Sequence, residues 1–182
     1  YLTNDSLGNI KYQSLLNKVP EKNRDFTDIW NIYTIDDKVI FETANKLFIY
    51  ENDSIRIIHT GGSLINTFKI NDELYLVDLD DGLKKLSKSK LTYLFNHKIF
   101  DSYLFKINGF NNPLIVSRNH GFYEIDDMKL TKWNVDSENI IINKRPYCGI
   151  KIDEEHIAIG TQLGGIFIIN NKGKVKQVIN KE

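Results

Sequence analysis

The chain has 182 residues, of which 41% are hydrophobic and 26% charged, the ordinary proportions of a globular protein. Lys and Arg together number 24, as do Asp and Glu, so there is no basic excess of the kind that nucleic-acid binding requires. No apolar run reaches the length of about 18 residues that a membrane-spanning helix needs, which argues against direct membrane insertion of this segment.

The apolar residues favour strands over helices. The chain has 9 Tyr and 10 Phe against 1 Met, and short alternating runs of apolar and polar residues are frequent. In residues 1–27, "NIKYQSLL" (residues 9–16) predicts one strand, and "NKVPEKNRDF" (residues 17–26) reads as a connecting loop. We expect this segment to be the tail of a preceding structural repeat, or a closing strand plus a loop.

From residue 28 onward the chain repeats. Each of four segments, residues 28–60, 64–95, 102–135 and 147–179, reads as four strands separated by tight polar turns. The third strand of each segment follows an anchor position, and these anchors recur at intervals of about 40 residues, close to the length of a propeller blade. The anchors are Lys46, Gly82, Gly121 and Gly165. The predicted turn residues are Asp36-Asp37, Asn71-Asp72, Asn108-Gly109 with Asn111-Asn112, and Asp153-Glu154 in the first turns, and Asn52-Asp53, Ser87-Lys88, Asp126-Asp127 and Asn171 to Gly173 in the third.

These repeats predict an all-β fold, a β-propeller fragment of about four four-stranded antiparallel blades. The expected blades are residues 28–62, 63–100, 101–146 and 147–182. Several meanders packed around an axis cover one another's faces, which a single meander cannot do alone. A β-sandwich with turns every 8–12 residues is the competing interpretation. A partial ring would expose the faces of its end blades, so neighbouring blades or a second copy are expected as partners.

The fourth segment, "IKIDEEHIAIGTQLGGIFIINNKGKV", resembles the two-component-regulator propeller repeat: an apolar strand, an Asp-rich turn, a strand ending in Gly-Thr, then Gly-Gly and an apolar residue. The stretch "YQSLLNKVPEKNRDFTDIWNIYTIDDKVIFETANKLFIY" is similar to another region of that family. In one departure, Ile157, Ala158 and Ile159 occupy the strand in which the family commonly has a tryptophan.

Proteins of this family are membrane-bound bacterial regulators. The resemblance implies that the chain is a periplasmic or otherwise extracytoplasmic sensor propeller of an inner-membrane protein. In such proteins a triple-tyrosine domain and a transmembrane helix follow, and then a histidine kinase or a helix-turn-helix domain that regulates transcription. Several relatives sense carbohydrate fragments, so a carbohydrate is the expected class of ligand. The alternative is a structural propeller that mediates protein association or dimerisation.

Two glycine-containing stretches invite other interpretations. In "GTQLGGI", Gly160 and Gly165 have the separation of a phosphate-binding P-loop, but Ile166 stands where that motif needs Lys. In "DLDDG", residues 78–82, the Gly comes one position too early for an EF-hand calcium loop, and Ser89 stands where the loop needs Glu. Both stretches are better explained as turns between strands.

No catalytic, metal or cofactor site is expected. The single cysteine, Cys148, lies in the apolar run "YCGIKI", which predicts a small buried side chain. The histidines lack the spacing of a zinc site, and paired carboxylates such as Asp36-Asp37 lie in predicted hairpin turns. The histidines are His59, His97, His120 and His156.

A ligand site, if the domain has one, should lie where loops converge at one end of the ring. For a sugar, aromatic rings should stack on the ligand while amides or a guanidinium bond its hydroxyls. Among the loops that precede the third strand of each repeat, the best polar candidates are Arg118, Asn119, His120 and Gln162. The competing interpretation is that these are ordinary exposed loop residues.

Overall fold

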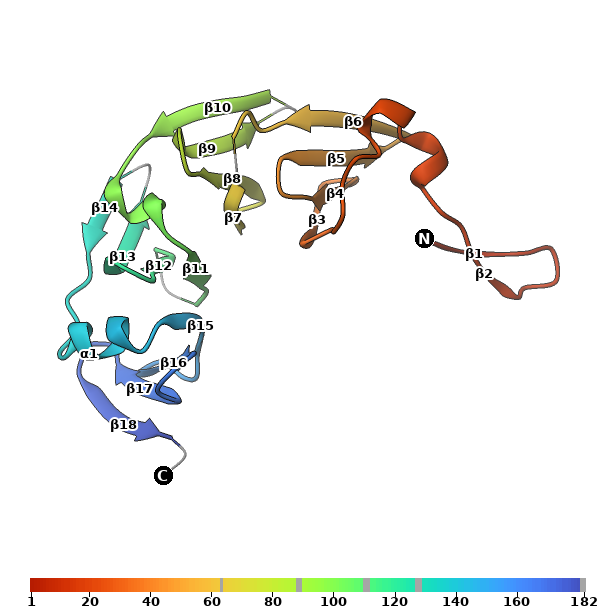
Figure 1. Ribbon diagram of the computed structural model, residues 1–182. Coiled ribbons are helices and arrows are strands. Elements are labelled where there is room, and N and C mark those ends of the chain that lie inside the picture. Colours follow the sequence, from red (N-terminus) through yellow and green to blue (C-terminus); the bar gives the residue numbers. More distant parts are fainter. Residues whose placement is uncertain (63, 88–89, 110–111, 127–128, 181–182) are drawn as a thin grey trace. The chain divides into compact units, whose positions relative to one another are not determined.

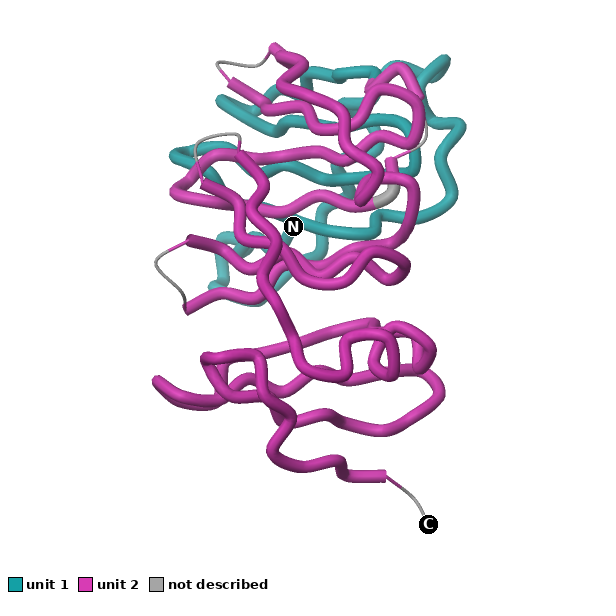
Figure 2. The backbone as a smooth tube through the Cα atoms, turned by 90° about the vertical axis from the view of Figure 1, so that its left-hand side faces the viewer, with its two compact units in different colours: residues 1–59 teal, residues 60–182 magenta. Residues whose placement is uncertain are grey.

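The computed structural model describes residues 1–62, 64–87, 90–109, 112–126 and 129–180. Its regular structure is almost entirely β: four four-stranded antiparallel sheets and one two-stranded sheet (Figure 1). The chain divides into two compact units, residues 1–59 and 60–182 (Figure 2). The first unit holds the two-stranded sheet and one four-stranded sheet, and the second holds the other three.

The first unit begins with a hairpin of β1 (Leu2–Asn4) and β2 (Ile10–Tyr12). The sequence predicted a strand at β2 but not its partner β1. Two single-turn 3-10 helices follow, and then the first four-stranded sheet, in which neighbours in sequence are neighbours in space. These elements are η1 (Leu16–Lys18), η2 (Glu21–Asn23), β3 (Asn31–Ile35), β4 (Lys38–Glu42), β5 (Lys46–Glu51) and β6 (Ser54–His59).

Within this unit, the segment between the hairpin and β3 packs on one face of the sheet. The Phe26 and Phe48 ring centroids lie 4.9 Å apart, and Phe48 is only 2% exposed. Leu16 and Val19 line a small apolar cavity of about 150 Å³ together with Phe26 and Phe48. Because burying each large apolar side chain contributes about 1.5–3 kcal/mol, these contacts hold the segment against the sheet.

The second unit contains three meanders and a short helix. Their strands are β7 (Leu64–Ile70), β8 (Glu73–Asp78), β9 (Gly82–Ser87) and β10 (Lys90–Phe95); then, after η3 (Lys98–Asp101), β11 (Leu104–Ile107), β12 (Leu114–Ser117), β13 (Gly121–Asp126) and β14 (Lys129–Lys132); then, after α1 (Glu138–Asn143), β15 (Pro146–Lys151), β16 (His156–Thr161), β17 (Ile166–Asn170) and β18 (Val175–Ile179).

The three sheets of this unit are arranged as neighbouring propeller blades. The first strand of the middle sheet, β11, lies against the first strands of the sheets on either side, β7 and β15 (Figure 1). First strands therefore gather on one side, and the later strands of each meander lead away from it. This is how blades sit around a propeller axis, and the predicted all-β propeller fold is confirmed.

Apolar side chains fill the space on both faces of the middle sheet. Phe105 and Phe122 belong to a cluster shared with Ile159 and Phe167 of the following sheet. On the other face, Ile115 and its neighbours pack with residues of β7, β8 and β9. A strand buried on both faces is apolar at successive positions, which explains the run "LIV" in β12.

The predicted hairpin turns owe their shape to residues that tolerate positive φ. Asn52 and Asp53 have φ of 48° and 59°, and Asn71 and Asp72 have φ of 47° and 61°. Two consecutive positive-φ residues form the type I′ turn that matches strand twist. Of the predicted turn residues, Lys88, Asn111 and Asp127 lie outside the described residues.

Helix α1 was not predicted. Its apolar residue Ile141 is fully buried in the core between the third and fourth sheets. Its first residue, Glu138, forms an ion pair with Lys132 at 2.7 Å and accepts a hydrogen bond from the Phe122 amide. A six-residue helix is too short to form on its own propensity, so these tertiary contacts stabilise it.

Candidate ligand-binding surface

The loops that carry the predicted ligand residues share one end of the second unit. In an antiparallel meander, the chain enters the first strand at the same end at which it leaves the second. Tyr103 immediately precedes β11, and Arg118 immediately follows β12. In the next sheet, Tyr147 lies at the start of β15, and Gln162 follows β16. The entry loops and the predicted loops therefore border the same surface.

Arg118, Tyr103 and Tyr147 form a stack of three planar groups on this surface. The guanidinium carbon of Arg118 lies 4.9 Å from the centroid of the Tyr103 ring. The Tyr103 and Tyr147 rings are stacked, with centroids 5.2 Å apart and planes inclined by 12°. The Arg118 amide donates to the Tyr103 carbonyl at 2.9 Å, and the Tyr103 hydroxyl donates to the Tyr147 carbonyl at 3.2 Å. These bonds hold the order of the stack.

Burial increases inward along the stack. Tyr147 is 50% exposed, whereas Tyr103 is partly buried. Burial, and then the neighbouring Tyr147, raise the pKa of the Tyr103 hydroxyl, although the Arg118 charge opposes them. Tyr103 is therefore neutral at physiological pH and acts as a hydrogen-bond donor. The Arg118 Nε is buried and has no hydrogen-bond partner among the described residues.

The structure places Asn119 and His120 on the same turn as Arg118. Asn119 is exposed. The His120 Nε2 lies 2.8 Å from Asp101 Oδ1, and the His120 carbonyl accepts a hydrogen bond from Lys132 at 2.8 Å. The His120 ring is therefore already bonded to the carboxylate of Asp101, whereas the side chain of Asn119 is exposed to solvent.

Gln162 lies apart from this stack in the fourth sheet. Its backbone amide donates to the Arg145 carbonyl at 3.0 Å, and its exposed side chain lines a groove beside α1. Three of the four predicted residues, Arg118, Asn119 and His120, therefore lie on one turn next to the tyrosines. The fourth, Gln162, lines a separate groove.

Sequence reasoning missed the two tyrosines. Each tyrosine lies near the beginning of a repeat, Tyr103 in "SYLFKI" and Tyr147 in "YCGIKI". Searching the entry loops of the repeats for aromatic residues would have found both. The expectation for Cys148 was wrong, because the residue is exposed. It lies on the uncovered face of its sheet, where its Sγ approaches Gly160 rather than a core side chain.

The glycine-containing loop after β16 is closed on itself. The Thr161 hydroxyl donates to the Gly165 carbonyl at 2.8 Å and accepts from the Gly164 amide at 3.0 Å. The Gln162 and Leu163 amides donate to carbonyls of the chain just after α1. These amides are therefore unavailable to cradle a phosphate, in agreement with the interpretation as a turn between strands.

The carboxylates of "DLDDG" have a structural role. Asp78 is fully buried, and its Oδ1 accepts from the amides of Asp80 and Asp81 at 2.9 and 3.2 Å. Lys84 lies 3.4 Å from Asp78 and 2.6 Å from Asp81. Burial lowers the pKa of Lys84, but the Asp81 hydrogen bond and the charges of both carboxylates outweigh it and hold this pKa above its ordinary value. Among the described residues, no group of three or more His, Cys, Asp or Glu could hold a metal ion.

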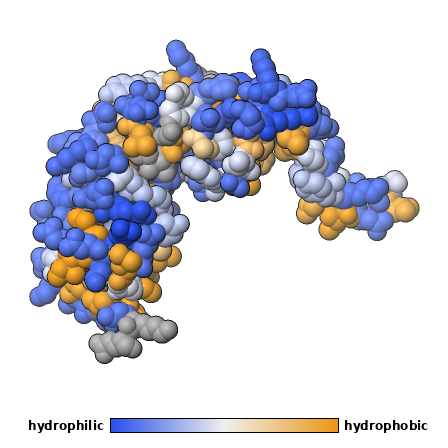
Figure 3. Space-filling view, viewed as in Figure 1, coloured by the Kyte–Doolittle hydropathy of each residue, from blue (hydrophilic) through white to orange (hydrophobic). Residues whose placement is uncertain are grey.

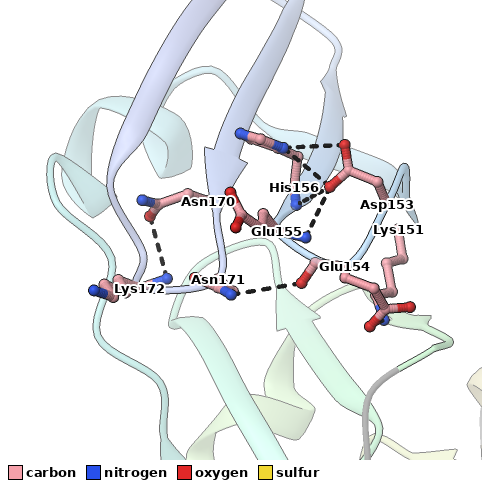
Figure 4. A network of polar contacts seen from close by, with 8 residues as sticks. All are labelled: Lys151, Asp153, Glu154, Glu155, His156, Asn170, Asn171 and Lys172. Atoms are coloured by element: carbon pink, nitrogen blue, oxygen red, sulfur yellow. Dashed lines mark hydrogen bonds and ion pairs between the residues drawn. The ribbon is translucent and has the colours of Figure 1, made fainter.

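At the opposite end of the fourth sheet, polar side chains bond one another (Figure 4). Asp153 Oδ1 accepts from the amides of Glu155 and His156 at 2.7 and 2.8 Å and lies 3.0 Å from the His156 ring nitrogen. The Asn171 amide donates to the Glu155 carbonyl at 2.7 Å, joining the two turns. The backbone hydrogen bond from Glu155 is the main reason why the pKa of Asp153 is lowered. This end of the sheet is thus locked by internal bonds.

The fold defines the chain as part of a β-propeller. No family model matches it, and no curated protein matches it in sequence. Among solved structures, it is similar to BBS1N in complex with ARL6DN (TM-score 0.60, 11% identity, covering 82% of this chain and 51% of the other). It is also similar to the N-terminal domain of Nup159 (TM-score 0.55, 13% identity, covering 81% and 46%).

A third similar structure is the extracellular domain of the putative hybrid two-component system BT3049 from B. thetaiotaomicron (TM-score 0.47, 15% identity, covering 96% and 30%). The chain spans about half the length, or less, of these solved structures. For BBS1N and Nup159, identities this low show a shared fold alone. In the described ranges, no helix has both the length and the apolar character needed to cross a membrane.

Proposed function

We propose that this chain is part of the extracytoplasmic sensor propeller of a bacterial membrane-bound regulator of the two-component type, and that it binds its ligand without catalysing a reaction. The repeat resemblance supports the class of protein. The observation that carries the binding role is the stack of Arg118, Tyr103 and Tyr147, with a half-exposed aromatic ring at the loop end.

A carbohydrate suits this surface. The face of a tyrosine ring covers the C–H groups of a sugar ring, and a guanidinium or amide bonds its hydroxyls. Tyr147 supplies the ring, and Arg118 and the exposed Asn119 supply donors at the neighbouring sheet.

Thermal-shift screening against a panel of neutral and acidic oligosaccharides, followed by calorimetry, tests this function. A bound glycan raises the unfolding temperature as its concentration exceeds Kd. We expect Tyr147→Ala to abolish the shift. Tyr93→Ala, at another exposed tyrosine on β10, is the matched control and should retain it. No stabilisation of the unaltered protein by any glycan at millimolar concentration would reject the carbohydrate proposal.

The second candidate function, association with a second copy, is favoured by an uncovered sheet face. The register places Ile150, Ile166 and Ile179 on one face of the fourth sheet, and they are 66%, 41% and 49% exposed. Figure 3 shows apolar residues gathered over this part of the molecule. Monomers rarely expose contiguous apolar patches above a few hundred Å². Light scattering should then detect a dimer that Ile150→Lys dissociates, and a monomer at all concentrations would exclude this role.

A further inference from the structure

A groove of about 650 Å³ lies beside helix α1 in the fourth sheet. Four of its lining side chains are apolar, and Ile140, Leu163 and Val178 are each at least 41% exposed. Phe167, which also lines it, is 5% exposed and belongs to the core. The groove can therefore accept an apolar side chain from outside and bring it against Phe167.

The polar lining of the groove is cationic or neutral. Lys144, Gln162 and Asn180 line it together with the apolar residues, and no carboxylate does so among the described residues. The stem of Lys144 lies against Gly164, where an added Cβ would be 2.6 Å from Lys144 Cγ. The Lys144 ammonium forms no ion pair within the described ranges.

Strand β18 continues this basic character along the outer edge of the sheet. It pairs with β17 on one side and is the last strand in the order of its sheet. Lys174 and Lys176 are exposed and, in the part of the chain that the structure describes, form no ion pair. The edge therefore offers backbone hydrogen-bonding groups between uncompensated positive charges, and its C-terminal end reaches the groove through Val178.

We infer that the edge of β18 and the groove together bind an extended acidic segment of a protein partner. Such a segment would add a strand to the sheet and place an apolar side chain beside Phe167. The carboxylates of the segment would meet Lys144, Lys174 and Lys176. Charge complementarity would therefore select an acidic segment and determine the direction in which it lies along β18. This interaction is independent of the sugar surface, because it uses neither Tyr103 nor Tyr147.

Lysines on an edge strand also have a protective role, since they discourage two sheet edges from pairing. The two roles predict different behaviour when the lysines of the edge are replaced by acidic residues. A docking edge that is charge-reversed loses its acidic partner but keeps the oligomeric state of the unaltered protein, whereas a protected edge that has lost its lysines self-associates more than the unaltered protein does.

The test uses the full chain and a fluorescein-labelled nine-residue peptide in which glutamate alternates with valine. Fluorescence anisotropy should rise with protein concentration, and the affinity should fall with added salt. The double variant Lys144→Glu/Lys176→Glu should weaken binding by about tenfold or more, as expected when facing charges become repulsive. On binding, hydrogen exchange should slow at the β18 amides, which binding to side chains alone would not cause.

Two controls make the outcome decisive. Lys129→Glu reverses the charge of one lysine on the outer strand of the third sheet, half the charge change of the double variant, and it should leave the affinity unchanged. A peptide of alternating lysine and valine should not bind. Equal binding of both peptides, equal loss in Lys129→Glu, unchanged exchange at β18, or stronger self-association of the double variant than of the unaltered protein would each overturn the inference. Tyr147→Ala should bind the peptide normally, so failure of the sugar proposal would leave this result intact.

Discussion

The guanidinium carbon of Arg118 lies 4.9 Å from the centre of the Tyr103 ring, and that ring stacks in turn on Tyr147. Tyr103 and Arg118 flank the first hairpin of the third sheet, whereas Tyr147 comes from the fourth. A cation–π contact is worth about 0.5–2 kcal/mol. Arg118 is therefore oriented before any ligand arrives, which reduces the entropy lost on binding.

Replacing Arg118 with Lys should separate the contribution of the stacked geometry to ligand binding from that of the positive charge. A lysine keeps the positive charge but lacks the planar group that stacks on Tyr103. We expect Arg118→Lys to weaken glycan binding about tenfold while changing the free energy of unfolding by about 1 kcal/mol or less. Calorimetry and urea unfolding measure the two effects. Unaltered affinity in this variant would show that the stack does not form the site.

The exposed thiol of Cys148 should react in the folded protein. It follows Tyr147 directly in sequence and is exposed. We expect Ellman's reagent to titrate one thiol per chain without denaturant, and Cys148→Ser to abolish the signal. If Tyr147 contacts the ligand, a saturating glycan should slow the reaction. A thiol that reacts only in urea would contradict the exposed position.

The buried pair Asp78 and Lys84 should matter more than an exposed pair in the same sheet. Removing Asp78 leaves the amides of Asp80 and Asp81 without their acceptor, and it leaves only the more exposed Asp81 to pair with Lys84. Breaking a buried ion pair by removing one partner costs up to about 3–5 kcal/mol. Asp78→Ala should therefore lower the midpoint of urea unfolding strongly. The control is Lys85→Ala, which breaks the more exposed pair with Glu73 and should cost about 1 kcal/mol or less. Equal effects of the two variants would refute the structural role of Asp78.

Glycine is required at Gly165 for two separable reasons. Its φ is 77°, and an added Cβ would lie 2.1 Å from the Ile179 carbonyl oxygen. Gly61 has a φ of 90° but only the end of the Lys84 side chain, at 3.8 Å, near such a Cβ. Gly61→Ala should thus cost about 1–2 kcal/mol of strain, and Gly165→Ala about 3 kcal/mol or more because backbone must also move. Urea unfolding of both variants compares the two costs.

Acid should weaken the locked end of the fourth sheet through Asp153. The Glu155 amide and the other hydrogen bonds lower the pKa of this carboxyl in the folded chain. Its stabilising contribution is therefore present above the unfolded pKa of about 3.9 and is lost as the pH falls through the lower folded value. Asp153→Asn should flatten the loss of stability below about pH 4.

Sequence reasoning succeeded where the deciding interactions are local. Asn52-Asp53 and Asn71-Asp72 were predicted as turns because Asn and Asp side chains cap local backbone groups, and the structure has turns with positive φ at all four residues. Sequence reasoning failed where contacts between distant segments determine the local structure or the burial of a residue. Helix α1 was not predicted, because what stabilises it is the core contact of Ile141 and the ion pair of Glu138 with Lys132. Cys148 looks buried in its apolar run, yet it lies on the face that no described sheet covers.

The sequence by itself determined the strands, the hairpin turns and their recurrence, because alternation and turn chemistry act between residues a few positions apart. It also placed Arg118, Asn119 and His120 on one turn. Only the tertiary structure decided that Tyr103 and Tyr147, 44 positions apart, stack beside that turn while Gln162 lines another groove. The reason is physical: which sheets lie side by side depends on how their buried faces pack, and that packing is long-range.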